Sequence, residues 1–197
     1  MSIKQKILLI DNFDSFTYNL LHIIEQFVDV DVIRVNNLQN NLLIVENYSK
    51  IIISPGPGTT KGYPILTKLI LKYYKTIPIL GICLGHQLIA DAFGCELFNM
   101  QTVNHGVQRN TKIISDTFIY KGINNQFLSG RYHSWAVSQK DFCNDFTITS
   151  IDDNGVIMSI QHKKYLLTGI QYHPESILTK NGNLILKNWL TRKIRNL

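Results

Sequence analysis

The sequence is poor in cysteine, proline and charge, and it holds no long apolar run. Its 197 residues include three cysteines, five prolines and 17% charged residues. No apolar run reaches the roughly 18 residues of a membrane-spanning helix, and the apolar start Ile7–Ile10 is shorter than the about 7–15 residues of a signal-peptide core. Three cysteines without a CxxC pair favour a reducing compartment. We therefore expect a soluble, cytoplasmic protein with no membrane partner.

The chain carries a modest excess of positive charge. Its formal net charge is +6, from 20 basic and 14 acidic residues, but the basic residues form no continuous block. The densest grouping, Lys187 to Arg195, has the pattern of a solvated helix end, where cations complement the helix dipole. We therefore expect no nucleic-acid partner. The length fits one domain over residues 1–197, large enough to bury roughly 70% of its unfolded surface.

The first half of the chain alternates short apolar runs with amphipathic segments. The expected strands are 7–10, 30–35, 51–53 and 79–82, and the expected helices are 15–27, 63–74 and 84–93. The second half is richer in strands, which we expect at 132–137, 146–151, 156–161 and 166–171, before a closing helix at 183–192. Short all-apolar strands between helices are typical of a parallel sheet. We therefore expect an α/β fold, a mostly parallel open sheet with helices on both faces and a small antiparallel strand section in the second half.

Cys83 lies between two glycines, where a predicted strand gives way to a predicted helix. The local sequence is Gly81-Ile82-Cys83-Leu84-Gly85. A residue on such a turn, a nucleophile elbow, has strained backbone at the end of the sheet, and flanking glycines relieve the crowding. The helix N-terminus also favours the thiolate, which is the attacking species. This pattern predicts a nucleophilic cysteine.

A base and a carboxylate follow a later predicted strand, in the segment His173-Pro174-Glu175. With Cys83 as nucleophile, His173 as base and Glu175 as the group that orients the base, all three roles of a catalytic triad have a candidate. The Pro-Gly loop 54–58 also follows a predicted strand. Because ligands bind beyond the carboxyl ends of the strands in open α/β sheets, we expect these residues at one edge of the sheet.

Other patterns in the chain support weaker interpretations. Cys95 and Cys143 have no flanking glycines, and we expect them to be small apolar residues of the core. The sequence contains no His-Glu-x-x-His motif and no pair of closely spaced cysteines, so we expect no metal site. Gly56-x-Gly58 after a strand suggests a dinucleotide-binding loop, but Lys61 stands where the third glycine is required.

Five motifs, in order between residues 6 and 190, together resemble one family. The segments Gly81–Gln87 and His173–Ser176 resemble the class I, triad-type glutamine amidotransferases. The segments Asp11–Asn19, Ser54–Gly58 and Arg131–Ser134 narrow the resemblance. With them, the chain looks like the small glutaminase subunits, component II, of anthranilate synthase and of aminodeoxychorismate (p-aminobenzoate) synthase.

The resemblance implies a reaction and a set of site residues. Cys83 would attack the side-chain amide of glutamine, His173 would pass the proton to the leaving ammonia, and Glu175 would hold the imidazole. Backbone N–H groups of Gly58 and Leu84 would stabilise the oxyanion, since Pro57 has none to donate. The residues implied to surround the glutamine are Gly56, Pro57, Gly58, Leu84, Gln87, Ser134 and Trp135. The ammonia would pass to a large chorismate-binding synthase subunit, and no cofactor is implied in this subunit.

Two departures from the family pattern concern the substrate pocket and the partner. Trp135 stands where the family usually has Leu, and Val103-Asn104 replaces a more usual Tyr or Met before a His-Gly pair. The same triad also fits a stand-alone hydrolase of γ-glutamyl amide bonds, and a third alternative is a subunit that only binds glutamine. The complete triad favours catalysis, and the Asp11–Asn19 segment favours a subunit with a partner. The sequence does not separate the anthranilate pathway from the p-aminobenzoate pathway.

Overall fold

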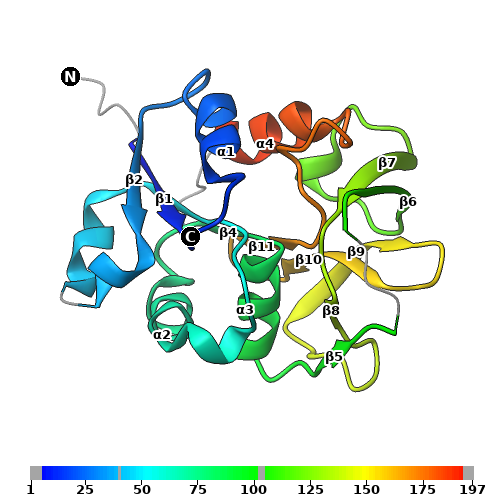
Figure 1. The fold of residues 1–197 in the computed structure, drawn as a ribbon, viewed down its shortest axis with the longest axis horizontal. Coiled ribbons are helices and arrows are strands. Elements are labelled where there is room, and N and C mark those ends of the chain that lie inside the picture. The colour runs from blue at the N-terminus through cyan, green and yellow to red at the C-terminus, as the bar shows by residue number, and fades with distance from the viewer. Residues whose placement is uncertain (1–5, 40, 102–104, 193–197) are drawn as a thin grey trace.

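The fold is built on one mixed sheet of nine strands (Figure 1). The computed structural model describes residues 6–39, 41–101 and 105–192. The parallel strands are β1 (Ile7–Asp11), β2 (Val30–Arg34), β3 (Lys50–Ile53), β4 (Ile79–Ile82) and β11 (Leu167–Ile170). The antiparallel strands are β10 (Ile157–His162), β9 (Phe146–Asp152), β6 (Val107–Ile113) and β7 (Gln126–Arg131). Their order in the sheet is β2-β1-β3-β4-β11-β10-β9-β6-β7.

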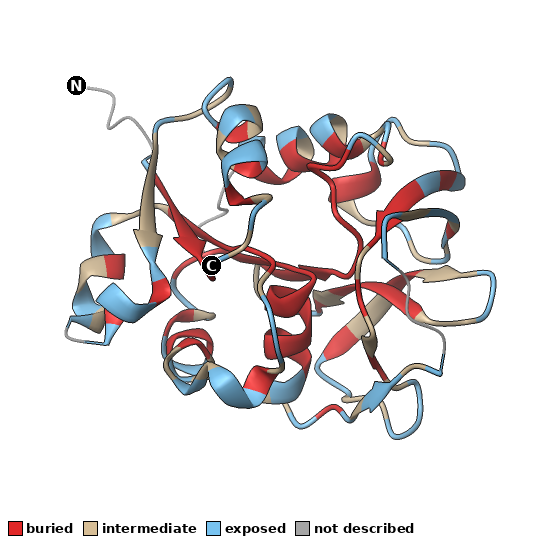
Figure 2. Ribbon diagram, in the orientation of Figure 1, coloured by how far each residue is buried: buried red, intermediate tan, exposed pale blue. Residues whose placement is uncertain are grey.

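Helices cover both faces of the parallel half of the sheet. Alternate side chains of β1 pack against different pairs of helices. Leu8 and Ile10 join an apolar cluster with α2 (Pro64–Tyr73) and α3 (Leu84–Ala92). Ile7 and Leu9 join a second cluster with α1 (Thr17–Ile24) and α4 (Gly182–Thr191). Successive strand residues point to opposite faces, so the central strands are buried on both sides (Figure 2). The mostly parallel α/β fold expected from the sequence is confirmed.

Several shorter elements complete the architecture. Single 3-10 turns or short 3-10 helices lie at Val35–Leu38, Leu42–Asn47, Thr60–Gly62 and Phe118–Tyr120. A two-stranded antiparallel sheet pairs β5 (Leu97–Asn99) with β8 (Trp135–Val137). Over the described ranges, every helix is too short or too polar to cross a bilayer.

The antiparallel half differs in detail from the expectation. The strands β5, β6 and β7 were not predicted, and only the last three residues of the expected strand 132–137 are a strand, as β8. The sequence of β6 is Val-Gln-Arg-Asn-Thr-Lys-Ile, in which Thr111 alone is buried. A half-buried strand is predicted from alternating apolar and polar residues. Because β6 lacks this alternation, the sequence did not indicate a strand there.

The start of α1 also differs from the expectation, which placed it at Ser15. The helix begins at Thr17, after a turn in which the Asp14 carboxylate accepts from the Phe16 backbone N–H at 2.8 Å. The Asp11 carboxylate accepts from the Thr17 hydroxyl at 3.0 Å. These side-chain bonds stabilise a turn in place of the first helical residues, and the turn brings Phe16 toward the end of the sheet.

The structure joins Cys95 and Cys143 in a disulfide. This corrects the expectation of two unpaired core cysteines. Cys95 is buried, as expected, whereas Cys143 is only partly buried. The two residues are 48 positions apart, so their spacing in the sequence gave no sign that they meet. Cys83 is the free cysteine.

Candidate active site

Cys83 occupies the sharp turn between β4 and α3. Its φ is +49° and its ψ −98°, a region that residues with a side chain rarely adopt. The backbone N–H of Cys83 donates to the Ile170 carbonyl at 2.8 Å, which holds the turn against β11. A Cβ atom at Gly81 would lie 2.3 Å from the Gly85 carbonyl carbon, and one at Gly85 would lie 2.6 Å from the Ile53 oxygen. The two glycines therefore let the helix start directly above the sheet.

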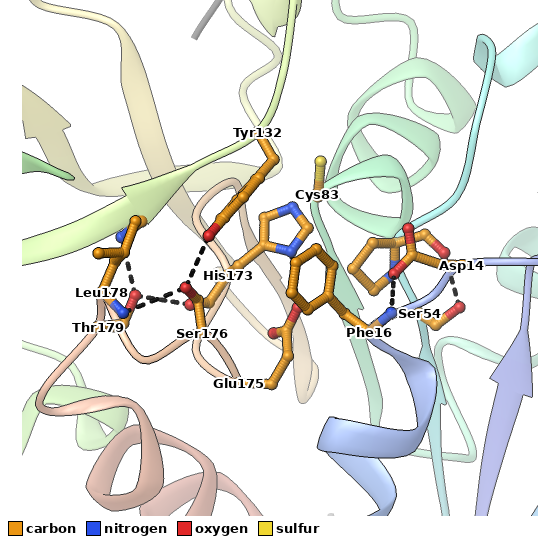
Figure 3. Close-up of polar contacts among 12 residues, drawn as sticks. Asp14, Phe16, Ser54, Cys83, Tyr132, His173, Glu175, Ser176, Leu178 and Thr179 are labelled. Atoms are coloured by element: carbon orange, nitrogen blue, oxygen red, sulfur yellow. Dashed lines mark hydrogen bonds and ion pairs between the residues drawn. The ribbon is translucent and has the colours of Figure 1, made fainter. Parts of the chain in front are cut away.

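His173 and Glu175 lie just beyond the carboxyl end of β11, next to the elbow (Figure 3). The distance between His173 Nδ1 and Glu175 Oε1 is 2.6 Å, and both side chains are buried. Because an ionised carboxylate only accepts, this contact places a proton on Nδ1. The imidazole lies between the Glu175 carboxylate and the Cys83 sulfur, so Nε2 serves the thiol side of the ring (Figure 3). The three side chains have the order required of nucleophile, base and orienting group.

The charges around His173 favour its protonated form. Burial opposes a charged imidazole, but the Glu175 carboxylate and the Cys83 thiolate outweigh it and raise the pKa of His173 well above its ordinary value of 6.5. A histidine held as imidazolium beside a thiol stabilises the thiolate. The site therefore holds an imidazolium next to the Cys83 sulfur, the arrangement in which an adjacent histidine activates a cysteine nucleophile.

Two aromatic rings pack on the imidazole. The ring centroids of Tyr132 and His173 are 4.8 Å apart, and those of Phe16 and His173 are 5.6 Å apart. The Tyr132 hydroxyl is 3.0 Å from the Ser176 hydroxyl. The backbone is anchored too, since the Thr179 hydroxyl donates to the His173 carbonyl at 2.6 Å. These contacts fix the orientation of the ring that must move the proton.

A cavity of about 160 Å³ opens beside the Cys83 side chain. It brings together residues from three separate segments: Gly56, Pro57, Gly58, Cys83, Leu84, Gln87, Tyr132, His133, Ser134 and Trp135. All seven residues expected to surround the glutamine are among them. Tyr132 and His133 are the two lining residues that were not in the expected set.

The Pro-Gly loop reaches the cavity because Asn12 clamps it. The Asn12 side chain donates to the Ser54 carbonyl at 2.8 Å, and its backbone N–H donates to the Ser54 hydroxyl at 3.0 Å. A Cβ atom at Gly56 would lie 2.7 Å from the Asn12 Cβ, so only glycine fits this approach. Gly58 has a φ of +80°, which turns the loop at the cavity wall. Leu84, the first residue of α3, has no intrahelical partner for its N–H, so this N–H is available to an oxyanion.

Gln87 and Trp135 form the opposite wall of the cavity. Gln87 Nε2 donates to the Trp135 carbonyl at 2.9 Å and to the side-chain oxygen of Gln171 at 3.1 Å. His133 Nδ1 lies 3.0 Å from the same Trp135 carbonyl. Burial, together with the nearby Arg131 charge, lowers the pKa of His133 to about 4. His133 is therefore a neutral hydrogen-bond donor that holds the backbone of this wall.

Sequence reasoning missed four residues of the site: Phe16, Tyr132, His133 and Gln171. Phe16 and Tyr132 lie inside two of the motifs quoted above, but nothing in the sequence showed that their rings contact His173. Gln171 lies two residues before His173, and no pattern marked it. The departure at Val103-Asn104 falls outside the described residues.

Comparison with known proteins places this geometry in a family. The family profile described as "Glutamine amidotransferase class-I" matches residues 8–193. The chain belongs to the class I glutamine amidotransferases. An anthranilate synthase component 2 of Methanocaldococcus jannaschii is 41% identical, and the match covers 100% of this chain and 97% of that protein. An aminodeoxychorismate synthase component 2 of Klebsiella aerogenes is 40% identical over 94% of this amidotransferase and 100% of the relative.

Solved structures carry the same fold. A glutamine amidotransferase of Thermotoga maritima superposes with a TM-score of 0.72 at 15% identity, covering 95% of this amidotransferase and 98% of that chain. A protein of Thermoplasma acidophilum reaches a TM-score of 0.84 at 21% identity, with 96% and 94% covered. Both likenesses concern the fold, and they agree with the parallel sheet and helix layers of this amidotransferase.

Proposed function

We propose that this chain is the glutaminase subunit of a chorismate-aminating synthase. It hydrolyses the side-chain amide of glutamine and supplies the ammonia to a large chorismate-binding subunit. The observation that carries this proposal is the buried His173–Glu175 pair, 2.6 Å between Nδ1 and Oε1, beside Cys83 at the wall of the cavity. The names of the relatives, component 2 of anthranilate synthase and of aminodeoxychorismate synthase, support the choice of pathway class.

In the proposed reaction, the Cys83 thiolate attacks the amide carbon of glutamine. The carbonyl electrons move to oxygen, where the N–H groups of Gly58 and Leu84 stabilise the negative charge. The imidazolium of His173 gives its Nε2 proton to the nitrogen, and ammonia leaves as the C–N bond breaks. Neutral His173 then takes a proton from water, whose oxygen attacks the thioester and releases glutamate. The balance is glutamine plus water to glutamate plus ammonia, and no cofactor enters these steps.

Direct delivery of ammonia requires a partner over the site. Ammonia is mostly protonated in neutral water, so it is a poor nucleophile once released to solvent. Two large apolar side chains stand exposed near the triad: Phe13 is 54% exposed beside the Pro-Gly loop, and Ile177 is 94% exposed beside Glu175. These two side chains lie on either side of the site, where a partner subunit that covers the site would bury them. We assign this face to the large subunit, and we place the complex in the cytoplasm.

The first test removes the nucleophile. Cys83→Ala and Cys83→Ser should abolish glutamine hydrolysis while the complex with the large subunit still makes product from ammonium salts. The measurement is chorismate amination with glutamine and, separately, with ammonium. Undiminished use of glutamine by either variant would overturn the assignment of Cys83.

A second test separates the partnered subunit from a stand-alone hydrolase of γ-glutamyl bonds. The chain is mixed in turn with an anthranilate-forming and an aminodeoxychorismate-forming large subunit from its own source. Glutamine-dependent product with one of them assigns the pathway, and product with both indicates a shared subunit. If neither couples while ammonium drives both, and the isolated chain hydrolyses glutamine at full rate, the stand-alone hydrolase replaces the proposal.

A further inference from the structure

Gln171 is a fully buried side chain in contact with the nucleophile. It follows the last residue of β11, and its backbone N–H donates to the Met158 carbonyl at 2.8 Å. Its Nε2 donates to the Cys83 sulfur over 3.6 Å, a distance normal for a hydrogen bond to sulfur. Gln171 does not line the glutamine cavity. Its side chain has two contacts: the Cys83 sulfur and the side chain of Gln87 in the cavity wall.

The polarity of this contact is set by a chain of hydrogen bonds that starts at a backbone carbonyl. The Trp135 carbonyl can only accept, so the atom of Gln87 that faces it at 2.9 Å must be the amide nitrogen. The same nitrogen faces Gln171 at 3.1 Å, so the Gln171 atom there must be the oxygen. The remaining end of the Gln171 amide, the NH₂ group, is therefore the one that faces Cys83. The sulfur meets a donor, and a donor favours the thiolate over the thiol.

We propose that Gln171 is a positioning residue that holds the Cys83 sulfur as a thiolate and aims it at the cavity. Gln87 orients Gln171 and at the same time forms part of the cavity wall. The chain Trp135–Gln87–Gln171–Cys83 thus links the wall of the cavity to the nucleophile. This inference rests on Cys83 being the nucleophile of the proposed glutaminase, but its main readout is the reactivity of the sulfur itself.

The test replaces the Gln171 amide without changing its length. Gln171→Met removes the donor and keeps an unbranched side chain, and Gln171→Glu keeps the shape while an ionised carboxylate offers only acceptors. The rate of Cys83 alkylation by iodoacetamide is followed from pH 5 to 10 by mass spectrometry of the Cys83 peptide. A matched control is Gln161→Met, because Gln161 donates to the Tyr165 and Leu167 carbonyls and has no contact with Cys83.

Gln171→Met should lower the alkylation rate at pH 7 about tenfold, as expected for the loss of one hydrogen bond to a charged group, and move the pH midpoint upward. Gln171→Glu should move the midpoint further, because its carboxylate repels the thiolate. In the complex with the large subunit, kcat for glutamine hydrolysis should fall about tenfold with KM within twofold of wild type. Gln161→Met should leave the alkylation profile unchanged.

The outcomes separate this inference from the proposed function. A folded Gln171→Met or Gln171→Glu protein with the wild-type alkylation profile overturns the positioning role, whatever happens to hydrolysis. Should Gln171→Met fail to fold, the isosteric Gln171→Glu decides alone. A shifted alkylation profile in a chain whose wild type hydrolyses no glutamine would support the positioning role and contradict the glutaminase. A loss of activity with an unchanged midpoint would assign Gln171 to packing and overturn the proposal.

Discussion

At the scale of single residues, the Glu175 carboxylate sets the charge of the catalytic imidazole. Glu175→Gln keeps a side chain of the same shape but removes the charge that raises the pKa of His173. We expect kcat for glutamine hydrolysis to fall on the order of a hundredfold, the usual scale of general acid–base catalysis. Because the pKa of His173 falls in the variant, the alkaline limb of the pH–rate profile should move to lower pH.

The measurement is glutamine hydrolysis by the complex between pH 6 and 9. Glu46→Gln is the matched control, since Glu46 is a surface carboxylate that accepts from the Tyr73 hydroxyl at 2.8 Å, away from the cavity. It should keep the wild-type profile. An unshifted profile in Glu175→Gln would mean that Glu175 only packs against the ring.

The catalytic roles of Cys83, His173 and Glu175 could be predicted, because each of these residues lies in a short motif that directly follows a strand. The glycine-flanked Cys83 and the His173–Glu175 segment each follow an apolar strand, and the parallel sheet brings them together as that order requires. Gln171 could not be predicted, because its role depends on a through-space contact with Cys83, 88 positions away. A buried glutamine beside a strand has the same local pattern whether it faces a sulfur or a backbone carbonyl.

At the scale of elements, a buried lysine holds the C-terminus of α4. Lys50, in β3, donates from Nζ to the carbonyls of Trp189, Leu190 and Arg192 at 3.1, 2.5 and 2.9 Å. The last carbonyls of a helix have no intrahelical partners, and leaving them buried without a donor is unfavourable. We expect Lys50→Met to lower the free energy of unfolding by about 2 kcal/mol, with a Tm lower by roughly 4–8 °C.

Thermal melting with and without urea measures this effect. Lys72→Met is the control, because Lys72 is a surface residue whose nearest carboxylate oxygen lies 3.9 Å away, and exposed ion pairs contribute little. Its Tm should stay within about 2 °C of wild type. An equal decrease of Tm in the two variants would show that Lys50 does not anchor α4.

Some elements of the fold could be predicted from the sequence, and others could not. The all-apolar strands β1, β3 and β4 and the amphipathic helices were predictable because burial on two faces leaves a clear pattern. Strand β6 could not be predicted. Most of its side chains are exposed or half-buried, so the strand does not need apolar residues and has no apolar pattern. The anchoring of α4 by a lysine about 140 positions away likewise leaves no local trace.

At the scale of the whole molecule, buried neutral histidines link stability to pH. Burial lowers the pKa of His86 to about 3, and burial with the Arg131 charge lowers that of His133 to about 4. In the unfolded chain both return to about 6.5, so the unfolded state binds more protons below that pH. Their contribution to stability is therefore complete above pH 6.5 and is lost as the pH falls toward 4. His173 has the opposite shift: it stays charged in the folded protein, whereas in the unfolded chain it loses its proton as the pH rises through about 6.5. Its contribution to stability is therefore complete below about pH 6.5 and partly lost at pH 7.

Between pH 7 and pH 5, each of the two histidines should cost about 2 kcal/mol of the free energy of unfolding. Urea titrations at the two pH values measure the difference. His133→Asn, whose amide N–H can replace Nδ1–H toward the Trp135 carbonyl, should remove about 2 kcal/mol from the pH dependence, while His22→Asn on the exposed face of α1 should leave that contribution in place. A wild-type stability that is flat from pH 7 to 5 would mean that protons reach these histidines without unfolding. The walls of the cavity, to which His133 belongs, would then open at moderate acidity, and alkylation of Cys83 at pH 5 would report it.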